Sequence, residues 1–165
     1  MTWNFRKPLI VMSPKSLLRH PLCVSSLSEL YTGTEFQPVI DEKLTAAQAK
    51  KIKRVIYCTG KIYYDLLEYR QKNNTEGIAI VRLEQLYPLH RGLLEETARR
   101  YPAAEKYWVQ EEPANMGAWT YIQSKLPEFQ FKVISRKTAA SPATGFKKLH
   151  DANQEKIVKE AMTLE

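Results

Sequence analysis

Between residues 54 and 164 the sequence alternates four times between a short apolar run and a longer amphipathic segment. The apolar runs are rich in β-branched and aromatic residues, as expected of buried strands. They span residues 54–58, 77–83, 106–110 and 131–136. The segments with apolar residues near helical spacing span residues 61–73, 90–101, 117–126 and 151–164. Such alternation predicts a doubly wound three-layer α/β/α sandwich with a mostly parallel sheet.

The beginning of the chain lacks this alternation. It contains "PKSLLRHP" (14–21) and a serine-rich "VSSLSELYTG" (24–33), in which we expect a short helix around Leu27 to Tyr31. We therefore divide the chain into an extended arm, residues 1–45, and an α/β domain, residues 46–165. Because the arm has apolar anchors but few regular periods, we interpret it as a connector that packs against a neighbouring domain.

Composition narrows the classes of function. The net charge of +7 is compatible with an anionic partner, but the basic residues are dispersed and lack an aromatic platform, so we expect no nucleic-acid binding. No apolar run approaches the roughly 20 residues that a membrane helix needs, so we expect no membrane partner. Two cysteines, Cys23 and Cys58, form neither a disulfide framework nor a zinc motif, and a reducing compartment is expected.

Three polar loops follow the expected strands, where parallel sheets place their ligands. Lys61 follows the glycine of "CTGK", which lacks the rest of a phosphate-binding motif and is also compatible with a simple turn. Arg82 interrupts an apolar strand, so it either binds an anion or pairs with Glu84 or a carboxylate of the next strand. Arg136 and Lys137 precede "TAASPATG", which is either an anion site lined by backbone or a tight structural turn.

The stretch "QEEPANMGAW" (110–119) places two adjacent carboxylates at a strand end. Neighbouring residues of a strand point to opposite sides, so Glu111 and Glu112 cannot act as one acid–base pair. Trp119 is expected in the core or in an interface. The sequence offers no nucleophile, metal cluster or positioned histidine nearby, and we assign no catalytic or metal-binding residue.

Four stretches in this order, "MSPKSLLRHP", "EQLYP", "QEEPANMGAW" and "SRKTAASPATG", resemble the C-terminal region of 2-oxoglutarate dehydrogenases. These are thiamine-dependent enzymes that decarboxylate 2-oxoglutarate in the tricarboxylic acid cycle. The resemblance implies a transketolase C-terminal-like domain from a longer homodimeric enzyme, located in the bacterial cytoplasm or the mitochondrial matrix. In this family a "GDG…NN" segment binds thiamine diphosphate and magnesium, and that segment is absent here. The resemblance therefore implies that this chain binds no cofactor and is inactive alone.

Within such an enzyme the resemblance implies structural roles for Glu111, Glu112 and Trp119, with one carboxylate bound by backbone N–H groups or by Arg82. It further implies contacts with the preceding domains, the second subunit and, through the whole enzyme, the succinyltransferase component. Some relatives bind acetyl-CoA or AMP as effectors. Charge and loop position favour four cationic residues for such a site: Lys61, Arg82, Arg136 and Lys137. The alternative is an autonomous acyl-CoA-binding or adenine-nucleotide-binding domain.

Overall fold

A computed structural model describes residues 7, 8 and 10–164 of the chain. Its contacts divide the chain into two compact units, Met1–Thr34 and Glu35–Glu165. The described part of the first unit contains two short 3-10 helices, η1 (Lys15–Arg19) and η2 (Leu27–Leu30). The second replaces the helix expected at this position and begins with a capping box between Ser26 and Glu29.

Most large apolar side chains of this first unit are exposed to solvent. They are Ile10, Val11, Met12, Leu18, Val24, Leu27, Leu30 and Tyr31. A short unit that leaves these residues uncovered has little core of its own.

The boundary between the units lies earlier than the division expected after residue 45. Asp41 and Glu42 are bound to the α/β unit: Arg100 pairs with Asp41, and Arg70 pairs with Glu42. Glu42 Oε1 also accepts a hydrogen bond from the backbone N–H of Ile80 at 2.9 Å. These contacts connect the end of the expected arm to the sheet.

The second unit is built on a five-stranded sheet in the order β1-β3-β2-β4-β5. Its strands are β1 (Val39–Ile40), β2 (Arg54–Cys58), β3 (Ile78–Leu83), β4 (Glu105–Pro113) and β5 (Lys132–Arg136). Only β1 runs antiparallel to its neighbour, β3. From the central strand β2 the chain continues to β3 on one side. It then crosses to the other side of β2, where it forms β4 and afterwards β5. The sheet therefore has a switch point between β2 and β4, where open α/β sheets bind ligands.

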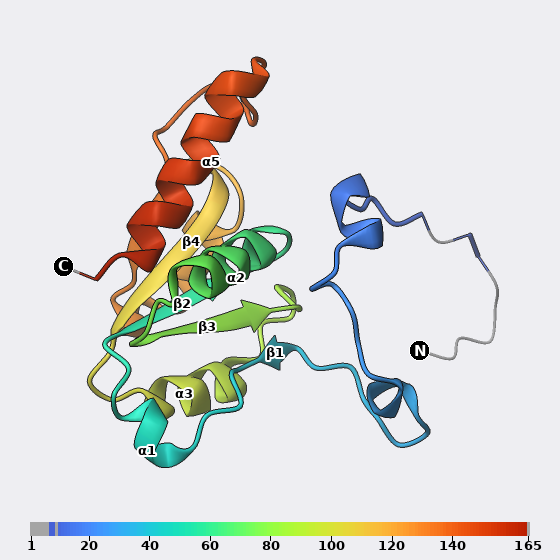
Figure 1. Ribbon diagram of the computed structural model, residues 1–165, viewed down its shortest axis with the longest axis vertical. Coiled ribbons are helices and arrows are strands. Elements are labelled where there is room, and N and C mark those ends of the chain that lie inside the picture. Colours follow the sequence, from blue (N-terminus) through green and yellow to red (C-terminus); the bar gives the residue numbers. More distant parts are fainter. Residues whose placement is uncertain (1–6, 9, 165) are drawn as a thin grey trace. The chain divides into compact units, whose positions relative to one another are not determined.

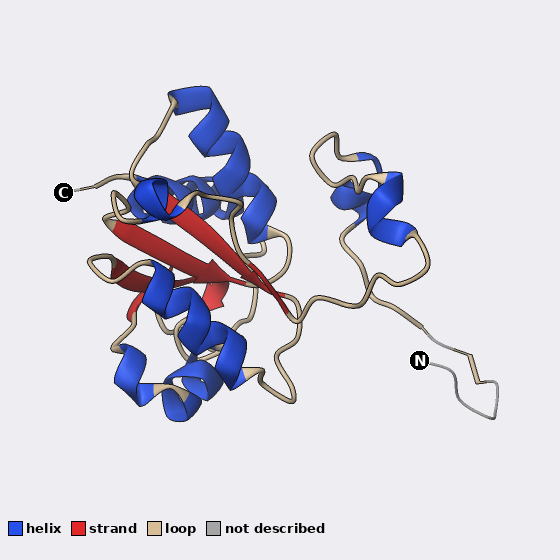
Figure 2. Ribbon diagram, turned by 90° about the horizontal axis from the view of Figure 1, so that it is seen from below, coloured by secondary structure: helices blue, strands red, loops and turns tan. Residues whose placement is uncertain are grey.

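Helices lie on both sides of this sheet (Figure 2). They are α1 (Ala46–Ala49), α2 (Ile62–Asn73), α3 (Arg91–Arg100), α4 (Trp119–Lys125), η3 (Pro127–Phe129) and α5 (Lys147–Met162). Helices α2 and α5 cover one face, and α1 and α3 cover the other (Figure 1). The expected three-layer sandwich is confirmed. Helix α5 starts before the expected residue 151, and Lys147 in its first turn pairs with Asp151 at 2.6 Å.

The two faces of the sheet have cores of different composition because successive strand residues point to opposite faces. The face covered by α1, α3 and α4, here called the aromatic face, buries five aromatic rings: Tyr57, Tyr101, Trp108, Trp119 and Phe129. The face covered by α2 and α5 is called the aliphatic face. Apart from Cys58 and Met162, its buried core residues are Ile, Leu, Val and Ala. Trp119 thus lies in the core, as expected.

A buried arginine connects the last helix to the sheet. Arg54 on β2 is only 5% exposed, and its Nη1 donates to the carbonyls of Glu160, Ala161 and Thr163 at 2.8–2.9 Å. Its guanidinium also lies 4.3 Å from the centroid of the Tyr107 ring. The cation therefore satisfies carbonyl groups that the end of α5 leaves without helical partners. No local sequence pattern predicts this role of Arg54.

Candidate functional site

The candidate site lies at the carboxyl ends of β2, β4 and β5, where the side chain of Gln110 holds the end of β4. Gln110 Oε1 accepts hydrogen bonds from Trp108 Nε1 at 2.8 Å and from the backbone N–H of Trp119 at 3.0 Å. Its Nε2 donates to the carbonyls of Pro113 and Met116 at 3.0 and 2.7 Å. One buried amide thus determines the shape of the turn after β4. Nothing in the local sequence pattern indicated this role.

Glycine at position 117 is part of the same arrangement. Gly117 has φ +66°, and a Cβ atom there would lie 3.1 Å from Gln110 and from Glu112 Oε2. Any larger residue would be strained by the positive φ, and its Cβ atom would lie too close to the side chains of Gln110 and Glu112. The "NMG" turn therefore allows Gln110 to reach the main chain.

Glu111 points to the aliphatic face and joins a polar cluster. Lys61 Nζ lies 2.6 Å from Glu111 Oε1 and 3.0 Å from Asp65 Oδ2. Gln154 of α5 donates to the same two carboxylates at 2.9 and 2.6 Å. Burial alone would lower the pKa of Lys61, but hydrogen bonds and charges of Glu111 and Asp65 outweigh it, so the pKa is raised. The cluster links the start of α2 to β4 and α5.

Arg136 at the end of β5 binds backbone rather than a carboxylate. Its Nε donates to the carbonyl of Glu111 at 2.9 Å, and its Nη1 donates to Thr144 Oγ1 at 3.1 Å. Its Nη2 also donates to the carbonyl of Pro142. Arg136 therefore fixes the loop 137–146 to the end of β4. Of the two expected roles of this loop, an anion site or a structural turn, these bonds support the turn.

Two pockets lie on either side of Arg136 and Asn153. The first, of about 530 Å³, is enclosed by β5, the following loop and α5. It is lined by Ser135, Arg136, Lys137, Thr138, Ala139, Thr144, Asn153, Lys156, Ile157 and Glu160. The second, of about 210 Å³, is lined by Glu111, Glu112, Arg136, Pro142, Ala143, His150, Asn153 and Gln154. The first pocket combines three cationic side chains with three hydroxyl groups and one carboxylate.

The four cationic residues chosen from the sequence have different surroundings. Arg136 and Lys137 line the same pocket. Lys61 is bound by two carboxylates, as described above. Arg82 pairs with Glu84 at 2.8 Å, one of its two expected partners, and its guanidinium lies 4.5 Å from the Tyr63 ring centroid. The expected alternative of a pair between Arg82 and a carboxylate of β4 is wrong, because β2 separates β3 from β4.

The family resemblance raises the question of thiamine diphosphate and magnesium. Within residues 7, 8 and 10–164 no group of three or more His, Cys, Asp or Glu side chains could hold a metal ion. The adjacent asparagines Asn73 and Asn74 end helix α2, and Asn74 has a left-handed φ of 49°. These described residues do not fit the cofactor. In the same part of the chain, no helix is long and apolar enough to cross a membrane.

The sheet order, its switch point and the two helical layers define a doubly wound α/β domain (Figure 2). A solved structure titled "Split gene transketolase, inactive beta4 tetramer" superposes with a TM-score of 0.51 and 18% sequence identity, covering 78% of this chain and 44% of that one. This likeness concerns the fold alone. Residues 24–162 match the family described as "2-oxoglutarate dehydrogenase C-terminal", and the chain belongs to that family.

Relatives of this chain occur in bacteria and among mitochondrial proteins. It is 48% identical over 166 residues to the 2-oxoglutarate dehydrogenase E1 component of Rickettsia felis. It is 42% identical over 168 residues to a protein of Pongo abelii named "2-oxoglutarate dehydrogenase-like, mitochondrial". These matches cover 95% and 98% of this chain but 17% of either relative. The chain therefore spans about a sixth of the length of these relatives.

Proposed function

We propose that this chain acts as the C-terminal structural domain of a 2-oxoglutarate dehydrogenase E1 enzyme, without catalysis of its own. The observation that carries the proposal is the identity of 48% over 95% of this chain but only 17% of the Rickettsia felis relative. The decarboxylation of 2-oxoglutarate, and the binding of thiamine diphosphate with magnesium, belong to the part of the enzyme outside this chain. The chemistry that the thiamine cofactor would supply, carbanion stabilisation, would be located in that part of the enzyme.

In this role the α/β unit is a stable body that the rest of the enzyme packs against. Glu111, Gln110 and Arg136 hold together the ends of β4 and β5, the turn after β4 and α5. We assign the exposed apolar residues of the arm to contacts with the preceding domains. The proposal also includes homodimer formation and, through the whole enzyme, assembly with the succinyltransferase component. Its location would be the bacterial cytoplasm or the mitochondrial matrix.

A chimeric enzyme tests this role. This chain replaces the matching segment of the Rickettsia felis enzyme, and 2-oxoglutarate-dependent reduction of ferricyanide is measured with thiamine diphosphate and Mg²⁺. We expect the chimera to be active, and this chain alone to be inactive. The unmodified Rickettsia felis enzyme is the positive control. A chimera that forms dimers by light scattering but has no activity would contradict the proposed role.

A second proposed function is the binding of a phosphorylated effector such as acetyl-CoA or AMP. The pocket lined by Arg136, Lys137 and Lys156 supports it, because cationic side chains and hydroxyl groups are the partners that phosphate prefers. Lys137 and Lys156 make no ion pair with other described residues, so their charges are available. Lys61 and Arg82 were expected at the same site, but each would have to leave its carboxylate partners before it could bind a phosphate.

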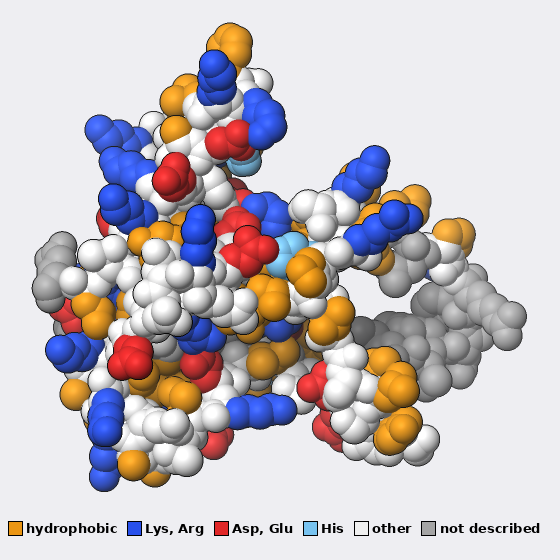
Figure 3. Space-filling view, in the orientation of Figure 1, with side chains coloured by type: hydrophobic (Ala, Val, Ile, Leu, Met, Phe, Trp, Pro, Cys, Tyr) orange, Lys and Arg blue, Asp and Glu red, His pale blue; other side chains and the backbone are white. Residues whose placement is uncertain are grey.

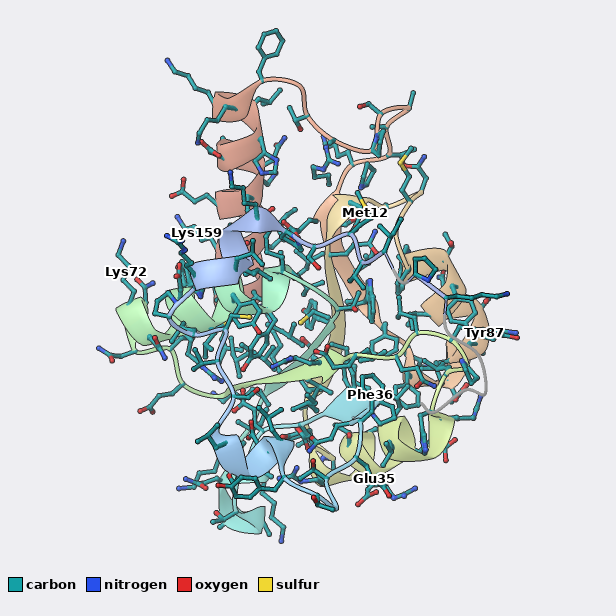
Figure 4. All side chains as sticks on the ribbon, turned by 90° about the vertical axis from the view of Figure 1, so that its right-hand side faces the viewer. Met12, Glu35, Phe36, Lys72, Tyr87 and Lys159 are labelled. Carbon is teal, nitrogen blue, oxygen red and sulfur yellow. The ribbon has the colours of Figure 1, made fainter. Side chains whose placement is uncertain are left out.

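Isothermal titration of acetyl-CoA, and separately of AMP, into this chain at low salt tests the second function. We expect the K137A/K156A double variant to weaken binding at least about tenfold, which corresponds to about 1.4 kcal/mol. Lys72→Ala is the matched control, because Lys72 is an exposed lysine of α2 that does not line this pocket (Figure 4). Equal affinity in the double variant and the wild type would exclude this pocket as the site.

A further inference from the structure

A third pocket lies at the carboxyl edge of the sheet, beside the turn that follows β4. Its volume is about 390 Å³, and it is lined by Thr59, Leu86, Tyr87, Gln110, Glu112, Gly117, Ala118 and Tyr121. We call it the Tyr87–Tyr121 pocket. Tyr87 is 83% exposed and projects from its loop (Figure 4). Most of the lining is therefore apolar or aromatic and accessible from solvent.

Glu112 carries the only charge among these eight lining residues. Its neighbour Glu111 is paired with Lys61, whereas Glu112 makes no ion pair within the described part of the chain. Two uncharged polar groups of the lining already have partners within the domain. The Thr59 hydroxyl donates to the carbonyl of Leu83 at 2.8 Å, and the Gln110 amide holds the turn. The carboxylate of Glu112 is thus the one group left to recognise a ligand by charge.

The local backbone keeps this carboxylate beside the apolar wall. A Cβ atom at position 117 would approach Glu112 Oε2 to 3.1 Å, so glycine leaves room for the carboxylate there. Tyr121 already attracts a cation, because the ammonium of Lys125 lies 6.0 Å from its ring centroid. An apolar pocket with aromatic rings and one free carboxylate complements a cation with an apolar stem.

We propose that the Tyr87–Tyr121 pocket binds an arginine side chain from a segment of the full-length enzyme that lies outside this chain. The guanidinium pairs with Glu112, while its plane and aliphatic stem pack against Tyr87, Tyr121 and Leu86. Arginine fits better than lysine because its planar fork can form two hydrogen bonds to one carboxylate and stack on an aromatic ring. Arginine and tyrosine are also enriched among the residues that dominate protein interfaces.

The source of the arginine rests on the proposed function, in which this chain is one domain of a longer enzyme. About five sixths of the Rickettsia felis relative lies outside the matched segment, since the match covers 17% of it. A free small cation would have only one carboxylate to hold it in an open pocket. A protein segment adds further contacts around the arginine and thereby explains why the Tyr87 side chain is exposed here.

Nuclear magnetic resonance can test the recognition directly on the 165-residue chain. The probe is N-acetyl-arginine N-methylamide, titrated into ¹⁵N-labelled protein. Its control is the citrulline analogue, which has nearly the same shape and no charge. We expect saturable shifts of the Gly117, Ala118 and Tyr121 amides, with a Kd of about 1–10 mM for the arginine probe. The citrulline analogue should bind at least about fivefold more weakly, because it cannot pair with Glu112.

Variants of the pocket make the test decisive. Glu112→Gln should remove the preference for arginine over citrulline, whereas Glu96→Gln, an exposed carboxylate of α3, should leave it unchanged. Equal binding of both probes to the wild type, or an unchanged preference in Glu112→Gln, would overturn the inference. An active chimera with either of these results would reject only the arginine pocket. An inactive chimera with a clear arginine preference would keep the pocket but reject its assignment to this enzyme.

Discussion

The two faces of the sheet stabilise the same domain with different chemistry. The aromatic face buries large rings that carry polar groups, and these groups need partners: Trp108 Nε1 bonds to Gln110, and the Tyr101 hydroxyl donates to Asp41 at 2.7 Å. The aliphatic face has few polar groups to satisfy and derives its stability from packing. Loss of one hydrogen-bonding side chain should therefore be most damaging on the aromatic face, and loss of packed volume on the aliphatic face.

The same difference continues to the carboxyl edge. On the aliphatic face Glu111 is surrounded by Lys61, Gln154 and the loop held by Arg136. Basic side chains are also prominent along α5 on the visible surface (Figure 3). On the aromatic face Glu112 borders an apolar pocket and has no cationic partner among the described residues. Two adjacent glutamates thus differ because strand geometry sends them to opposite faces.

The largest effect is expected for Gln110→Leu. The substitution keeps a side chain of similar size but removes the hydrogen-bond partner of the buried N–H groups of Trp108 and Trp119 and of the Met116 carbonyl. Each such buried group costs about 1–3 kcal/mol, so we expect a loss of about 4 kcal/mol in the free energy of unfolding. Urea denaturation followed by circular dichroism measures it. Gln123→Leu on the exposed side of α4 is the control and should change stability by less than about 0.5 kcal/mol.

A packing substitution probes the aliphatic face. Leu66 of α2 is fully buried, and Leu66→Ala should cost about 3 kcal/mol through lost apolar burial and the cavity that remains. Leu149→Ala on α5 is the control, since Leu149 is 53% exposed, and we expect a change below about 0.5 kcal/mol. The same denaturation assay applies. If Leu66→Ala cost no more than this control, stabilisation of the aliphatic face by packing would be refuted.

The two faces should lose stability at different alkaline pH values, because their buried ionisable groups differ. Burial raises the pKa of the Cys58 thiol on the aliphatic face to about 12 from 9.0, and burial also raises the pKa values of Tyr57 and Tyr101 on the aromatic face. A raised pKa in the folded state means that the unfolded state releases its proton first. The stabilisation is therefore complete below the unfolded pKa and is lost as pH rises through the folded one.

Between pH 9 and 10 Cys58 should contribute a fall of up to about 1.4 kcal/mol per pH unit, and above pH 10 the two tyrosines should add to it. The measurement is the free energy of unfolding by urea at a series of pH values. Cys58→Ala should flatten the curve between pH 9 and 10, and Tyr101→Phe only above pH 10. Identical curves for Cys58→Ala and the wild type would show that the thiol does not contribute.

The regular helices and strands of the domain could be predicted because each one has its own apolar pattern in a short stretch of sequence. The strand "RVIYC" and the helix that follows it need only their own apolar pattern to be identified. Strand β1 could not be predicted, because two residues have no periodicity. Its neighbour Pro38 accepts hydrogen bonds from the backbone N–H groups of Glu84 and Gln85, which lie far along the chain. Such a strand exists only when β3 is already in place.

The partners at the candidate site depend on strand order, which no local pattern contains. Glu111 pairs with Lys61, rather than with Arg82, because β2 lies next to β4 and β3 does not. Gln110 was overlooked for a related reason: a buried glutamine becomes identifiable only when the carbonyls and N–H groups around it are known. Sequence reasoning did find that the adjacent glutamates would point apart, because that follows from the strand alone.

The smallest effect concerns the Lys61–Glu111 pair, whose side chains are about one quarter exposed. Lys61→Met and Glu111→Gln are combined in a double-mutant cycle, with the free energy of unfolding measured at low and high salt. We expect a coupling of about 1 kcal/mol, since partial burial strengthens the attraction while solvent still screens it. Gln154 and Asp65 remain as partners for the residue that is left, which limits the loss in each single variant. The corresponding cycle of Lys61→Met with Glu112→Gln should give a coupling near zero, because Glu112 belongs to the other face. A coupling with Glu112 as large as that with Glu111 would show that the two carboxylates act as one site after all.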